Sequence, residues 1–110
     1  MRTRVDLREA LVGVLVKLGI REQNGRGHIY FQPPASEKMV YPAILYTLSG
    51  IPAEHADNRP YLHHKRYMVT AVDKNPDSRL PEELALLPTA RFDRHYTSGN
   101  LNHWVFTITV

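Results

Sequence analysis

Apolar side chains in the first part of the chain recur at intervals of three and four residues. This spacing places them on one side of an α-helix, and the residues concerned are Leu7, Leu11, Val14, Leu15 and Leu18. Thr3 and Asp6 have the spacing of a capping box at the start of such a helix, and Gly19 suits the position just after its end. The pattern predicts an amphipathic helix over residues 4–18 that packs on a sheet.

A strand pattern of period two lies in the middle of the chain, over residues 67–72. Both alternating sets consist of apolar or small residues: Tyr67, Val69 and Ala71 in one, and Met68, Thr70 and Val72 in the other. We therefore predict a central strand with both faces covered. The next segment, Asp73–Ser78, favours a turn because Asn, Asp and Ser side chains bond nearby backbone and Pro76 fixes its own φ.

Further segments have the patterns of short strands and of one short helix. The strands are expected at residues 28–32, 43–48, 90–96 and 104–110, and the helix at residues 79–87. The strand at 43–48 is predicted to lie inside the sheet, because it is apolar throughout.

The last two strands are expected to pair as a hairpin across a turn at residues 97–100. Alternation in the first of them predicts that Phe92 and Tyr96 point inward, and that the outward residues are Arg91, Asp93 and His95. In the second, one face is expected to carry Trp104, Phe106, Ile108 and Val110.

Two stretches without a regular apolar period are predicted to be loops. They are residues 33–40 and residues 49–60, and the second contains several turn-forming residues. A loop of about 12 residues with no structure of its own is often a binding element. We interpret residues 49–60 as a candidate contact surface, with a plain surface excursion between strands as the alternative.

The order helix, three strands, helix, two strands predicts an α+β fold. We expect a mostly antiparallel sheet of about five strands, with the N-terminal amphipathic helix and the second short helix packed on it. The chain of 110 residues fits a single domain, 1–110, with one core.

Composition narrows the class of protein. The chain is 43% hydrophobic and 23% charged, and no apolar run approaches the roughly 18 residues of a membrane span, so a soluble protein is expected. The first residues lack the cleavage pattern of a signal peptide, and the absence of cysteine excludes disulfides and thiolate chemistry. These features predict a cytoplasmic location.

Candidate catalytic and metal-binding chemistry is sparse. The six histidines match no metal-ligand spacing. Asp73, Asn75 and Asp77 begin like a calcium loop, but Ser78 stands where that loop requires Gly, and Leu84 where it requires a bidentate Glu. Asx-type turns that cap the next helix explain these side chains better. No nucleophile motif is present, so we predict a non-enzymatic protein without cofactor or metal.

One basic cluster interrupts the otherwise interspersed charges: His63-His64-Lys65-Arg66. A solvated strand end or a subunit contact explains this cluster. The alternative is a small nucleic-acid-binding module that uses the cluster and exposed tyrosines.

Short segments from Tyr41 to the C-terminus carry a family resemblance. The sharpest are Ala56-Asp57-Asn58-Arg59-Pro60-Tyr61, Asp73-Lys74-Asn75-Pro76-Asp77-Ser78 and Asn100-Leu101-Asn102-His103; Tyr41–Tyr46, Arg66–Thr70 and Phe92–Tyr96 add to them. In these segments the chain resembles the tail terminator, or tail-to-head joining, proteins of long-tailed bacteriophages and prophages.

The resemblance implies an α+β fold and a structural role. Proteins of this family form a ring, typically a hexamer, that caps the head-proximal end of the tail tube and docks the head connector. The implied partners are other copies of the chain, the tail tube protein and the connector or stopper protein, with no membrane and with nucleic acid only passing through the ring. The implied location is the virion tail, assembled in the bacterial host cytoplasm. A neighbouring head–tail joining adaptor is the alternative.

We hypothesise that two polar segments make subunit or tail-tube contacts. A head-to-tail contact in a ring presents a different surface on each side of the subunit, which suits interspersed charge. The candidate residues are Glu54, Asp57, Asn58, Arg59, His63, His64, Lys65 and Arg66. Alternatively, Asp57 and Asn58 fix the 49–60 loop through local hydrogen bonds.

Overall fold

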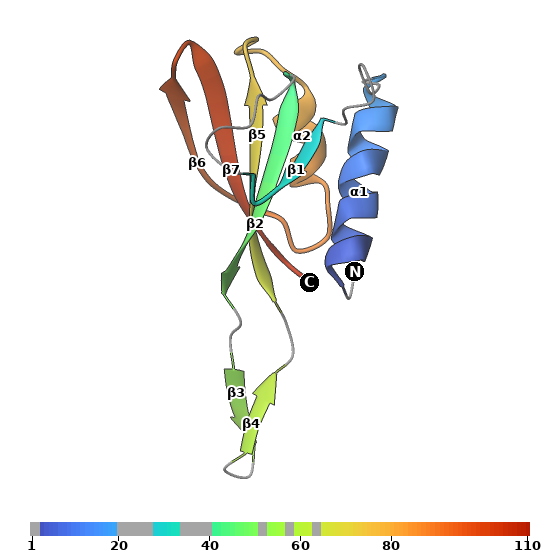
Figure 1. Cartoon of the computed structure of the whole chain (residues 1–110), viewed down its shortest axis with the longest axis vertical. Coiled ribbons are helices and arrows are strands. Elements are labelled where there is room, and N and C mark those ends of the chain that lie inside the picture. Colours follow the sequence, from blue (N-terminus) through green and yellow to red (C-terminus); the bar gives the residue numbers. More distant parts are fainter. Residues whose placement is uncertain (1–2, 20–27, 34–40, 51–52, 57–58, 63–64) are drawn as a thin grey trace.

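Two helices, a five-stranded sheet and a separate pair of strands make up the part of the chain that the computed structural model describes (Figure 1). That part comprises residues 3–19, 28–33, 41–50, 53–56, 59–62 and 65–110, with 53–56 and 59–62 described through their backbone. The elements are α1 (Arg4–Lys17), β1 (Ile29–Phe31), β2 (Ala43–Gly50), β3 (Ala53–Ala56), β4 (Arg59–Leu62), β5 (Arg66–Asp73), α2 (Leu80–Ala85), β6 (Arg91–Ser98) and β7 (Leu101–Thr109).

The five-stranded sheet has the order β1-β2-β5-β7-β6. Only the β1–β2 pair is parallel; β2–β5, β5–β7 and β7–β6 are antiparallel. The predicted α+β fold with a mostly antiparallel sheet is confirmed. The predicted central position of β5 and the interior position of β2 are confirmed as well.

Helix α1 begins with the predicted capping box. The Asp6 backbone N–H donates to Thr3 Oγ1, and the Thr3 backbone N–H donates to Asp6 Oδ2, each at 3.2 Å. The helix ends at Lys17, one residue before the predicted end, and Gly19 follows with φ +75°. Its buried side is the predicted apolar stripe: Leu7, Leu11, Val14 and Leu15.

Both helices pack on one face of the sheet, because a single core cluster joins them to it. The cluster contains the buried side of α1 together with Ile44, Tyr46, Tyr67, Val69, Ala71, Leu80, Leu84, Phe106, Ile108 and Val110. The Lys17 Nζ atom also lies 2.8 Å from Glu83 Oε2, which ties the end of α1 to α2. The predicted apolar face of β7 is confirmed.

The face of the sheet away from the helices, here called the open face, carries Leu45, Thr47, Met68, Thr70, Val105 and Thr107. The prediction that both faces of the central strand are covered is wrong for Met68 and Thr70, which are half-buried. The physical reason is the antiparallel pairing, because such sheets need helices on only one side.

The turn after β5 is built from local hydrogen bonds, as predicted. The backbone N–H of Asn75 donates to Asp73 Oδ1 (3.2 Å), and that of Asp77 donates to Asn75 Oδ1 (2.9 Å). The Leu80 N–H donates to Ser78 Oγ at 3.2 Å where α2 begins. Helix α2 is shorter than the predicted 79–87 segment.

Strands β6 and β7 form the predicted hairpin. Gly99 (φ +57°) and Asn100 (φ +63°) occupy its tight turn, where both central residues require positive φ. A bulge between Phe92 and Arg94 shifts the register with β7. It places Phe92 and Tyr96 on opposite faces, and both are exposed, at 58% and 42%. The predicted inward direction is correct for Phe92, which lies opposite the core residue Phe106, and wrong for Tyr96; the predicted outward direction is wrong for His95, which lies opposite Trp104. The bulge between Phe92 and Arg94 reverses the alternation, and Phe92 stays exposed because β6 is an edge strand.

The prediction of a loop over residues 49–60 is also wrong. Strand β2 continues to Gly50, and β3 pairs with β4 in an antiparallel hairpin with Ala53 opposite Leu62 and Ala56 opposite Arg59. Figure 1 shows this hairpin beyond the sheet, along the 50 Å axis of a molecule 29 and 27 Å across. The sequence of these strands has no regular apolar period, and a hairpin outside the five-stranded sheet does not require one. The loop predicted at 33–40 lies outside the described residues except for Pro33.

Candidate interaction surfaces

The histidines whose side chains the structure describes hold the fold together. His28 is buried, and its Nδ1–H donates to the Pro42 carbonyl oxygen at 2.7 Å. His95 Nε2–H donates to Asn102 Oδ1 at 3.1 Å, and His103 Nδ1–H donates to the Leu101 carbonyl oxygen at 3.2 Å. The first two bonds therefore join strands or strand ends, whereas the His103 bond stays within β7.

The described residues contain no group of three or more His, Asp or Glu side chains that could hold a metal ion. Among the same residues, no helix is long and apolar enough to cross a membrane.

The candidate contact residues from the sequence lie on and around the β3–β4 hairpin. Glu54 is in β3 opposite Tyr61, and Arg59 is in β4 opposite Ala56. Lys65 and Arg66 lie where the chain re-enters the sheet, and both are exposed. The other four candidates lie outside the described residues: Asp57, Asn58, His63 and His64.

Backbone pairing fixes the base of the hairpin. The Val110 N–H donates to the Lys65 carbonyl oxygen at 2.8 Å, and the Lys65 N–H donates back to Val110 at 3.1 Å. Ser49 Oγ donates to the Arg66 carbonyl oxygen at 3.0 Å. With its backbone held by these neighbours and by Thr109 opposite it in β7, Arg66 has a defined position from which its side chain extends.

A groove of about 780 Å³ lies beside this base, at the start of β6, and we call it the Arg91 groove. Its lining residues are Arg66, Thr89, Arg91, Phe92, Asp93, Thr107 and Thr109. Asp93 is ion-paired with Arg94 (2.9 Å), so the lining charges without a carboxylate partner among the described residues are Arg66 and Arg91. The groove is therefore basic, and the ring of Phe92, which lines its edge, packs against Phe106 on the helix side of the sheet.

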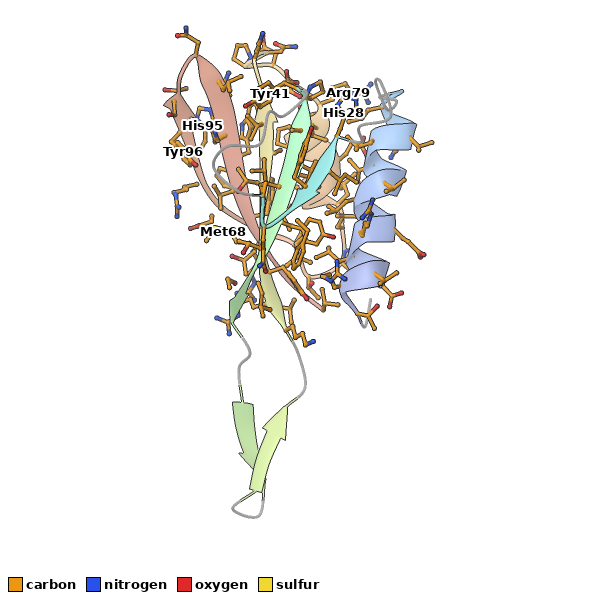
Figure 2. All side chains as sticks on the ribbon, in the orientation of Figure 1. His28, Tyr41, Met68, Arg79, His95 and Tyr96 are labelled. Carbon is orange, nitrogen blue, oxygen red and sulfur yellow. The ribbon has the colours of Figure 1, made fainter. Side chains whose placement is uncertain are left out.

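Further along β6, aromatic and basic side chains cover the neighbouring strand. The rings of Tyr96 and His103 stack with centroids 4.6 Å apart and planes within 9°, and the Arg94 guanidinium lies 5.9 Å from the Tyr96 ring centroid. Figure 2 shows Tyr96 and His95 at the edge of the sheet farthest from α1. Because Tyr96 already contacts His103 and Arg94, we consider the groove the more open part of this edge.

The outer side of α1 is a second surface, on the opposite side of the molecule from β6 (Figure 1). Val5, Val12 and Val16 are 54%, 41% and 69% exposed, and Glu9 lies among them. Intervals of four, three and four residues place all four on one helix face, here called the valine stripe. The Glu9 side chain has no partner among the described residues.

Sequence reasoning selected only one residue of these two surfaces, Arg66. The valine stripe had a readable signal, because Val5, Val12 and Val16 fall on the helix side opposite the leucines. The Arg91 groove had no such signal, because Arg66 and Arg91 come together only through the pairing of β5 and β6 with β7.

Comparison with known proteins adds no family: no protein-family model matches the chain, and no curated protein is significantly similar to it.

Proposed function

We propose that the chain is the subunit of a ring, typically a hexamer, that caps the head-proximal end of a phage tail tube and joins it to the head connector. The observation that carries the proposal is the presence of two unlike surfaces on opposite sides of one subunit: the valine stripe and the Arg91 groove. Closed rings are built by repeating one contact between unlike surfaces. The resemblance of residues 41–110 to tail terminators supports the same role.

The β3–β4 hairpin supports a contact role at one end of the subunit. An isolated two-stranded hairpin is marginally stable in water, so a hairpin that extends beyond the sheet gains from a neighbour or a tube surface. The predicted contact residues Glu54, Asp57, Asn58 and Arg59 belong to this segment. In this proposal the hairpin contacts another subunit or the tail tube. The protein is then located in the virion tail.

Native mass spectrometry over a range of protein concentrations tests the ring. We expect one closed species of fixed stoichiometry, and electron microscopy should reveal a cap at one end of tail tubes from the phage or prophage that encodes the chain. A protein that stays monomeric at every concentration and leaves tube ends bare would contradict the proposal.

The hairpin contact has its own test in the triple variant Asp57→Ala, Arg59→Ala and Arg66→Ala. We expect weaker ring formation or tube capping without loss of the fold. Normal assembly of this variant would reject the contact role. Loss of thermal stability in Asp57→Ala alone, with normal assembly once folded, would instead support a local role for Asp57 in holding its turn.

One observation favours a second candidate, a small nucleic-acid-binding module. Arg66, Arg91 and Arg94 lie opposite Thr109, Thr107 and Val105 of β7, so register places all three on the open face. Such a module binds labelled single-stranded DNA with an affinity that falls steeply with salt. An unchanged fluorescence anisotropy of the DNA at low salt would exclude it.

A further inference from the structure

The two arginines of the Arg91 groove extend from the same face of the sheet. Arg66 lies opposite Thr109 and Arg91 lies opposite Thr107, both on the open face of β7. Because β7 runs between the two strands that carry the arginines, their backbones are two strand spacings and two residues apart, or about 12 Å. Two long side chains with these starting points, which line one groove, can reach a small ligand from opposite sides.

The charges that face this groove do not cancel. Asp93 is the one carboxylate among its described lining residues, and it lies 2.9 Å from the Arg94 guanidinium, so this pair is neutral. Neither Arg66 nor Arg91 has an ion-pair partner in the described part of the chain. The groove therefore offers two positive charges to a ligand.

The backbone from which Arg91 extends is held in an unusual conformation. Thr89 has φ +63°, in the left-handed region, which is strained for a β-branched residue. Its Oγ1–H donates to the Thr109 carbonyl oxygen at 2.7 Å, and the same oxygen accepts from the Thr109 N–H at 3.1 Å. These two bonds fix the chain just before β6 begins. Strain of this kind is concentrated at ligand and active sites, because the surrounding structure must hold it.

We infer that the Arg91 groove binds a phosphate monoester, with its terminal phosphate group between Arg66 and Arg91. Such a group carries a charge of about −1.5 to −2 at pH 7 and three strong acceptor oxygens, which matches two guanidinium groups. Guanidinium groups bond phosphate oxygens in pairs. Thr107 and Thr109 line the same groove and supply hydroxyl donors.

The charge also selects against other anions. A carboxylate or a phosphodiester carries a single negative charge, so it would leave the charge of one of the two arginines uncompensated. The inference does not depend on the proposed ring, because it assigns a ligand to the groove of each chain.

Isothermal titration calorimetry tests the site directly. Sodium phosphate at pH 8 is titrated into the full chain, and sodium acetate at the same ionic strength serves as the control anion. We expect saturable binding of one phosphate per chain and no saturable binding of acetate.

Variants of the two arginines test which residues hold the phosphate. Arg66→Gln and Arg91→Gln each remove one charge, and we expect each to weaken phosphate binding by about tenfold. Arg8→Gln is the matched control, because Arg8 is an exposed arginine of α1, away from the open face. It should bind phosphate within about twofold of the wild type. Circular dichroism checks that all three variants keep the fold.

Two oligonucleotides distinguish the sources of the phosphate group. A short thymidine oligonucleotide with a 5′-phosphate is compared with the same oligonucleotide with a 5′-hydroxyl. If the 5′-phosphorylated form binds more tightly than both inorganic phosphate and the hydroxyl form, the site takes the end of a nucleic acid. If inorganic phosphate binds at least as tightly as the phosphorylated form, the site takes a small phosphate. Either result supports the site.

Four results would overturn the inference: no phosphate binding by the wild type, acetate binding as tight as phosphate binding, Arg91→Gln binding phosphate like the wild type, and equal binding of the two oligonucleotides. The last result would mean that the groove binds backbone phosphodiesters, as the nucleic-acid-binding module does. None of these results bears on ring formation, which native mass spectrometry tests separately.

Discussion

The two sides of helix α1 carry similar apolar residues, but one side is buried and the other is exposed. Leu7 and Leu11 are completely buried against the sheet, whereas Val12 and Val16 face solvent in the single chain. The difference does not come from hydrophobicity, because valine and leucine are both typical core residues. It comes from what each side can pack against: the sheet covers one side of the helix, and no element in the described part of the chain covers the other.

This comparison separates residues that make the fold from residues available to a partner. Burial of the leucines contributes to the free energy of folding, while the exposed valines contribute little to the stability of the isolated subunit. A helix with both kinds of side can be tested by substitutions that affect one side at a time.

The largest expected effect is that of Leu11→Ala on the buried side. It removes side-chain volume from a fully buried site, so we expect a loss of about 2–5 kcal/mol in the free energy of unfolding. The neighbouring Val12→Ala is the matched control and should change stability by less than about 0.5 kcal/mol. Urea denaturation followed by circular dichroism measures both. If both variants lost the same free energy of unfolding, the two sides of α1 would not differ in their contribution to stability.

The next effect concerns the capping box, which stabilises the N-terminus of α1. Thr3→Ala removes the acceptor for the Asp6 N–H, and we expect it to cost about 1 kcal/mol. Thr3→Ser retains a hydroxyl oxygen and should recover most of the loss. The midpoint of urea denaturation gives both values, and a Thr3→Ala protein as stable as the wild type would argue that the cap is not formed in solution.

The smallest effect has the opposite sign. Gly13→Ala fills open space in the middle of a helix, so we expect a gain of about 0.5–1 kcal/mol in the stability of the dilute, unassembled subunit. The control Gly19→Ala places a Cβ at φ +75°, which strains the backbone and should destabilise the protein. Thermal unfolding at low concentration distinguishes the two. A destabilising Gly13→Ala would mean that the chain itself packs on this position.

Local sequence patterns predicted the elements that the local chain specifies. The capping box, the leucine side of α1 and the Asx turns after β5 depend on residues within a few positions of one another. The β6–β7 hairpin was equally readable, because its turn residues Gly99 and Asn100 suit positive φ.

The errors have long-range causes. The bulge in β6 arises from the pairing with β7, where the register shifts between Phe92 and Arg94. The alternation of residues 90–96 does not indicate this shift. The β3–β4 hairpin was not predicted, because its two strands pair outside the five-stranded sheet. Pro60 within β4 also favours the end of a strand.

The candidate site was predicted less completely than the fold, for a related reason. A surface such as the Arg91 groove combines Arg66 of β5 with Arg91 of β6, and these two residues become neighbours only through β7 between them. Polar, turn-rich sequence indicated where contacts could occur but not which side chains share a surface.

The strand order also has a kinetic consequence. The β6–β7 hairpin joins residues that are close in sequence, and hairpins of this kind form in microseconds. The central strand β5 must instead find β7 across the whole α2 segment, so that Tyr67 meets Ile108 and Arg66 meets Thr109. Loop closure is costly before such distant contacts form, and domains rich in them fold on the millisecond to second scale. Newly made subunits therefore complete the surface shared by Arg66 and Arg91 late, which delays the Arg91 groove relative to the locally formed α1.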